Sequence, residues 1–206
     1  MTFELNLLFT NQDLENIYAT NSSVAIAKPV KGADPTIVWQ LFKPLQNNTL
    51  QFKEELGIYA STTEVQSGTT ITMLSKTPIP AVQNKLYTFE NSGVISGPTD
   101  GGYPNSYTLQ NDYSNKPYMT VGLYQNAIVN GQAMDNKPIS GNSVLFRSTI
   151  NMESINSLYL WIESNLHSAA FVDNVTSPMT KVDFSGGKTQ ISLKYDATSG
   201  TFIPIS

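Results

Sequence analysis

The stretch Gln190-Ile191-Ser192-Leu193-Lys194-Tyr195 decides the fold class, because polar and apolar residues alternate in it without interruption. A period of two places the apolar side chains on one face of an extended strand. The same pattern begins the chain, where the apolar positions are Phe3, Leu5, Leu7 and Phe9. Both stretches therefore predict β-strands with one buried face.

Further alternating or apolar runs follow along the chain, among them residues 36–42, 144–150 and 158–162. Turn signals such as Lys31 to Pro35 and Ser185 to Gly187 separate them. Short strands between frequent turns are typical of a β-sandwich. The sequence predicts an all-β protein, an antiparallel β-sandwich that forms a single domain over residues 1–206. Residues 36–42 are largely apolar on both faces and are expected to form a central strand.

One short helix is expected near the N-terminus. Thr10 can cap it, with Asp13 three residues further on, and Leu14, Ile17 and Tyr18 form an apolar stripe behind the cap. A second helical turn is also considered, at residues 151–155. The first helix is expected to close the sandwich after the first strand.

The composition excludes several chemistries. The chain has no cysteine, which removes disulfides, thiolate catalysis and cysteine-ligated zinc. Charged residues make up only 14% of it, and 21 Ser, 21 Thr and 19 Asn residues supply much of the polar surface. The net charge is −4 and Arg147 is the one arginine, so no basic face for nucleic acid is expected.

The N-terminal residues do not have the pattern of a secretory leader. Asp13 and Glu15 precede the first lysine, Lys28, and no long apolar run follows. No run approaches the length of a membrane span. The expected location is the cytoplasm, or release from the cell without a signal peptide.

The usual catalytic patterns do not fit the chain. His167 is the only histidine, lies in a polar connection, and is expected to be a solvent-facing loop residue. The stretch Ser185 to Thr189 ends like a phosphate-binding loop, but Val182 stands where that motif needs glycine, so a hairpin turn is predicted. We therefore predict no catalytic residues, no cofactor and no metal site.

Tyrosines are concentrated between Tyr103 and Tyr124, where five of the ten lie. Tyrosine offers a flat apolar ring and a hydrogen-bonding tip, which suits contact with sugars or proteins. In the strand predicted at 117–125, Tyr118 and Tyr124 share the face opposite the apolar residues, and Gly122 leaves space between them. The candidate ligand-binding residues are Tyr103, Tyr107, Tyr113, Tyr118, Tyr124, Asn105 and Asp112. The competing interpretation is that these tyrosines are strand formers covered on both faces.

The sequence is compatible with three classes of function. The first is a non-enzymatic, lectin-like protein that recognises a glycan or another cell-surface ligand through surface tyrosines. The second is a small β-rich pore-forming or membrane-targeting toxin, in which the amphipathic residues 61–77 would refold into a barrel. The same run is equally an ordinary edge hairpin. The third is a self-assembling structural subunit, for which a homo-oligomer is expected.

Overall fold

The computed structural model describes residues 1–31, 35–173 and 175–205. Strands dominate these residues, and they contain one helix, α1 (Asn11–Ala19). The strands are β1 (Thr2–Leu8), β2 (Ser23–Ala27), β3 (Gln40–Phe42), β4 (Asn47–Lys53), β5 (Gly57–Ser61), β6 (Ser75–Lys76), β7 (Leu86–Phe89), β8 (Ile95–Thr99), β9 (Tyr107–Asn111), β10 (Tyr118–Val129), β11 (Gln132–Pro138), β12 (Asn142–Leu145), β13 (Thr149–Met152), β14 (Ser157–Glu163), β15 (Thr180–Asp183), β16 (Gln190–Asp196) and β17 (Thr201–Pro204).

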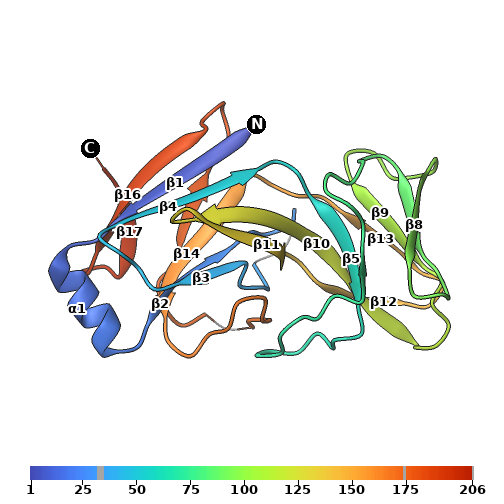
Figure 1. Ribbon diagram of the computed structural model, residues 1–206, viewed down its shortest axis with the longest axis horizontal. Coiled ribbons are helices and arrows are strands. Elements are labelled where there is room, and N and C mark those ends of the chain that lie inside the picture. The colour runs from blue at the N-terminus through green and yellow to red at the C-terminus, as the bar shows by residue number, and fades with distance from the viewer. Residues whose placement is uncertain (32–34, 174, 206) are drawn as a thin grey trace.

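The strands form three sheets packed together. The largest has nine strands in the order β17-β16-β1-β4-β10-β5-β6, with β11 and β12 also paired to β10. The other two have four strands each, in the orders β13-β9-β7-β8 and β15-β14-β2-β3. Figure 1 shows the β13-β9-β7-β8 sheet at one end of the molecule and α1 at the other. The predicted all-β fold is therefore confirmed, with 49% of the residues in strands.

The pairing is mostly antiparallel. Within the described ranges, two pairs are parallel, namely β1 with β16 and β7 with β9. A parallel pair needs a crossover connection, so these strands meet partners that are distant in sequence. The alternating stretch at 190–195 thus lies in the large sheet between β1, from the start of the chain, and β17, from its end.

Strand β10 organises the large sheet. Its twelve residues pair with β5 and then β4 along one edge, and with β12 and then β11 along the other. The register with β11 shifts between Gln125 and Ala127, which marks a β-bulge. Bulges bend a strand and redirect its side chains, and the exposed residues Asn126 and Ile128 of β10 lie in or next to this bulge.

Alternation in β1 is confirmed, because Phe3, Leu5 and Leu7 are all buried in the main core. A second and smaller core lies on the other face of β10 and β5. It consists of Ile37, Tyr59, Ile71, Tyr124 and Phe171. The central part of β10 is therefore covered on both faces.

The predicted N-terminal helix is confirmed together with its cap. Thr10 Oγ1 accepts the backbone N–H of Asp13 at 3.2 Å, and Asp13 Oδ2 accepts the backbone N–H of Thr10 at 2.8 Å. This reciprocal pair is a capping box. Ile17 points into the main core. Within the described residues, no helix has the length and apolar character needed to cross a membrane.

Three local expectations were wrong. Residues 36–42 do not form a central strand, because only Gln40–Phe42 is extended and β3 lies at the edge of its sheet. Residues 151–155 are not a helical turn, since β13 covers Thr149–Met152 and pairs with β9. Residues 185–187 do form a turn, but it joins strands of two different sheets and is not a hairpin. The turn predicted from Lys31 to Pro35 lies partly outside the described residues.

Candidate functional site

The seven residues predicted to bind a ligand do not form one site. Tyr103 is exposed over 60% of its surface, whereas Tyr107 and Tyr124 are exposed over only 5% and 2%. Tyr113 is half-buried and packs its ring 5.1 Å from that of Phe89, against the main core. The seven residues are therefore divided between core and surface.

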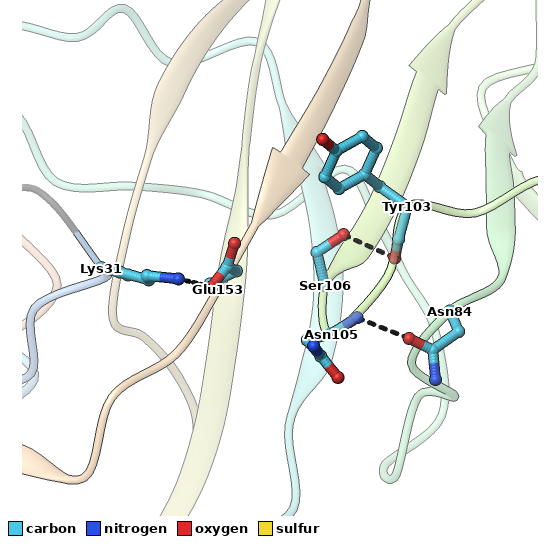
Figure 2. A network of polar contacts seen from close by, with 6 residues as sticks. All are labelled: Lys31, Asn84, Tyr103, Asn105, Ser106 and Glu153. Atoms are coloured by element: carbon cyan, nitrogen blue, oxygen red, sulfur yellow. Dashed lines mark hydrogen bonds and ion pairs between the residues drawn. The ribbon is translucent and has the colours of Figure 1, made fainter.

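The exposed loop between β8 and β9 holds Tyr103 and Asn105. The backbone of this loop is held by two hydrogen bonds: Asn84 Oδ1, from the segment before β7, accepts the Asn105 N–H at 2.6 Å, and the Tyr103 carbonyl accepts the Ser106 hydroxyl at 2.9 Å. Figure 2 shows the Tyr103 ring turned away from both asparagines. Asp112 likewise has an internal partner, since its carboxylate accepts the Gln110 side-chain amide at 2.9 Å. The bonds at Asn105 and Ser106 fix the backbone of the loop, and the Tyr103 ring stands exposed on it.

The expectation that Tyr107 and Tyr124 are surface residues was wrong. Tyr107 is part of the main core. The Tyr124 ring packs so closely on Gly57 that a Cβ there would lie 2.1 Å from its Cε1 atom, and its hydroxyl donates to the Thr77 carbonyl. Burial raises the pKa of both phenols.

Gly122 does not leave the ligand space that was predicted. A Cβ at this position would lie 1.9 Å from the carbonyl oxygen of Ser140. That oxygen accepts a hydrogen bond of 2.7 Å from the buried hydroxyl of Tyr59. Because Gly122 has no side chain, the backbone at Ser140 and the Tyr59 ring can approach β10 closely. The second core therefore fills the space beside Gly122.

Two of the predicted tyrosines line hollows, and Tyr118, the less buried of them, lines a pocket of mixed polarity. This Tyr118 pocket has a volume of about 270 Å³ and is lined by Thr62, Thr63, Glu64, Asn115, Lys116, Pro117, Tyr118 and Thr120. It lies where β10 begins, and Tyr118 is half-buried there. The pocket joins the two segments that the sequence had singled out separately, 61–77 and 103–124.

Segment 61–77 lies in an edge hairpin and consists mostly of its loop. Strands β5 and β6 pair at the edge of the large sheet, and residues 62–74 form the long loop between them. Thr120 fixes the start of this loop, because its hydroxyl donates to the Thr63 carbonyl. The backbone N–H of Thr63 is also held, by Ser61 Oγ at 3.0 Å. One wall of the Tyr118 pocket is thus anchored to β10 itself.

A second hollow surrounds the bulge of β10, and sequence reasoning missed it. It consists of two adjoining depressions of about 330 and 480 Å³ that share Ile79 and Asn126. We call this the bulge groove. Its lining residues are Thr2, Gln51, Phe52, Lys53, Glu55, Lys76, Thr77, Pro78, Ile79, Tyr124, Asn126, Ala127, Ile128, Ala133, Asp135 and Asn136. They come from five separated stretches of the chain, so no local motif marks them.

His167 lies exposed in the loop after β14, as predicted. In the part of the chain that the structure describes, no three His, Asp or Glu residues are close enough together to hold a metal ion.

The chain matches no known protein family, no curated protein and no solved structure.

Proposed function

We propose that this protein is a non-enzymatic carbohydrate-binding protein and that the Tyr118 pocket is its sugar site. The observation that carries the proposal is the half-buried Tyr118 ring, which has Asn115 and the hydroxyl-bearing Thr62 beside it in a pocket of about 270 Å³. A sugar presents both an apolar ring face and a set of hydroxyls, so it needs an aromatic surface beside donors and acceptors.

The polar groups of the pocket support this ligand class. Asn115 supplies an amide with both a donor and an acceptor, Thr62 a hydroxyl, and Glu64 a carboxylate that accepts hydrogen bonds. All three residues are exposed, so these groups are accessible to a ligand. Such a mixture can bind hydroxyl groups of a neutral ligand.

The walls of the pocket are held in place before a ligand arrives. Tyr118 lies in register with Leu145 of β12, and Thr120 is bonded to the loop at Thr63. A site that is already ordered loses less conformational entropy on binding. This favours recognition without a large rearrangement.

The test is a glycan array followed by titration calorimetry with the best glycan. We expect Tyr118→Ala to weaken that glycan roughly three- to tenfold, as loss of an aromatic contact does. Tyr103→Ala is the matched control, because Tyr103 is an exposed tyrosine of the same segment that does not line the pocket. It should leave the affinity unchanged.

Two results would contradict the proposal. One is an array without any glycan above background. The other is a glycan whose affinity falls as much with Tyr103→Ala as with Tyr118→Ala, since that would place the sugar outside the Tyr118 pocket.

A further inference from the structure

The bulge groove has a polar end and an apolar end. At the polar end lie Lys76, Asn126 and Asn136, with Thr77 and the Tyr124 ring. At the apolar end lie Ile79, Ala127, Ile128 and Ala133, with part of Phe52. Binding clefts combine an apolar lining with a few placed polar groups, and this groove has that composition.

The polar end is rich in hydrogen-bond donors. The Lys76 ammonium group lies 5.8 Å from the centre of the Tyr124 ring, and it forms no ion pair within the described residues. Asn126 Oδ1 accepts the backbone N–H of Asn136 at 2.8 Å. This bond fixes the orientation of the Asn126 amide, whose Nδ2 group can donate to a bound molecule. An uncompensated cation next to an amide donor suits an anion.

The acidic residues of the groove lie at the other end. Glu55 and Asp135 line the apolar depression, and Lys53 lies 4.0 Å from the Glu55 carboxylate. An anionic group placed there would meet two carboxylates and a lysine that already has a partner. The charge distribution thus sets one orientation, with the anionic group of the ligand at Lys76.

The apolar end can bury the rest of such a ligand. Ile128 is a large apolar side chain exposed over 44% of its surface on a strand whose other apolar residues are mostly buried. Covering it and its neighbours removes apolar surface from water, which is favourable in proportion to the area.

We propose that the bulge groove binds a small amphipathic anion, a carboxylate joined to an apolar chain, with the carboxylate at Lys76 and the chain along Ile79 and Ile128. This site is independent of the proposed sugar site. Residues 118 and 126 are eight positions apart on β10, which corresponds to roughly 26 Å.

The experiment is a ¹H–¹⁵N NMR titration of the whole protein with three probes: octanoate, octylammonium and acetate. Octanoate has the charge and the chain, octylammonium has the chain with the opposite charge, and acetate has the charge alone. We expect saturable shifts with octanoate at Lys76, Asn126, Ile128 and Asn136. Acetate should bind more than about tenfold more weakly, because it lacks the methylenes that the groove buries. Octylammonium should also bind more weakly than octanoate.

Variants then locate the two ends of the ligand. Lys76→Gln should weaken octanoate about three- to fivefold, the range expected for one exposed ion pair. Lys194→Gln is the matched control, because Lys194 is an exposed lysine of the same sheet that does not line the groove. Ile128→Asn should weaken octanoate without affecting acetate.

The proposal is overturned if octanoate does not bind or if octylammonium binds as tightly. It is also overturned if Lys194→Gln weakens octanoate as much as Lys76→Gln does. Octanoate binding that Tyr118→Ala leaves unchanged supports the groove as a separate site, whatever the outcome of the glycan array.

Discussion

The Lys28 ammonium group lies 5.0 Å from the centre of the Phe52 ring, and both side chains are buried. Lys28 is only 1% exposed, and its hydrogen bond goes to Gln125 Oε1 at 3.1 Å, not to a carboxylate. Burial lowers the pKa of Lys28 to about 8, and the negative charge of Glu54 opposes this shift only in part. The interior between β2 and the large sheet therefore contains a lysine whose charged form is disfavoured by folding.

Replacing Lys28 with methionine should stabilise the protein most at neutral pH. The unfolded lysine has a pKa near 10.5, so between pH 8 and 10.5 the unfolded state binds more protons than the folded state. The free energy of unfolding of the wild type therefore rises between pH 8 and 10.5 because of Lys28. The difference in the free energy of unfolding between Lys28→Met and wild type should fall by on the order of 3 kcal/mol from pH 7 to 10.5. Urea unfolding at several pH values measures it.

Tyrosine ionisation also changes the stability at high pH, but it affects Lys28→Met and wild type alike. Burial raises the pKa of the Tyr59, Tyr107 and Tyr124 phenols. Unfolded tyrosines ionise first, so stability falls with pH above about 10 in both proteins. A difference between the two proteins that stays constant from pH 7 to 10.5 would show that Lys28 is not perturbed by folding.

Gly122→Ala should be among the most damaging single changes in β10. The new methyl group would lie 1.9 Å from the Ser140 carbonyl oxygen and 2.7 Å from the Tyr59 ring, and the first of these is backbone. We expect a loss of about 3 kcal/mol or more in the free energy of unfolding, as for severe overpacking. The measurement is urea unfolding monitored by tyrosine and tryptophan fluorescence.

Gly131→Ala is the matched comparison. Gly131 has a φ of 78°, but a Cβ there would meet nothing within 4 Å. Only backbone strain opposes this change, and we expect a cost of about 1 kcal/mol. A loss at Gly122 no larger than the loss at Gly131 would mean that the close approach of Ser140 does not exist.

The part of the fold that the sequence predicts is the part set by neighbouring residues. Alternation placed Phe3, Leu5 and Leu7 on a buried face, and the spacing of Thr10 and Asp13 placed the helix start. Both depend on interactions within a few residues. Parallel pairing of β1 with β16 joins residues about 186 positions apart, and no local pattern encodes such a partner.

The candidate site was predicted less well, for a related reason. Alternation correctly put Tyr118 and Tyr124 on the face opposite Met119, Val121 and Leu123, all of which are buried. It could not show that Tyr59 and Phe171 cover the second face near Tyr124 while leaving Tyr118 at a pocket. Which end of a face is covered depends on distant segments. The Ser61–Thr77 run was singled out for its own alternation, and its contact with β10 is visible only in three dimensions.

Thr10→Ala should destabilise the protein by about 1 kcal/mol, because it removes the Thr10 hydroxyl from the capping box. The Asp13 backbone N–H would lose its acceptor at the helix N-terminus. Thr10→Ser keeps the hydroxyl and is the control. Thermal unfolding by circular dichroism should separate the two variants, and equal melting temperatures would argue against a contribution of the cap.

Two tyrosine hydroxyls that donate to backbone carbonyls allow the effect of burial to be isolated. Tyr59 donates to Ser140 at 2.7 Å inside the second core, and Tyr18 donates to Pro44 at 2.9 Å from the surface of α1. In Tyr59→Phe the Ser140 carbonyl loses this donor where water does not replace it, so we expect a loss of about 1–3 kcal/mol. In Tyr18→Phe water can hydrate Pro44, and the loss should stay within about 0.5 kcal/mol. Urea unfolding of the two variants tests this order, and a Tyr18→Phe loss equal to that of Tyr59→Phe would mean that the second core is open to solvent.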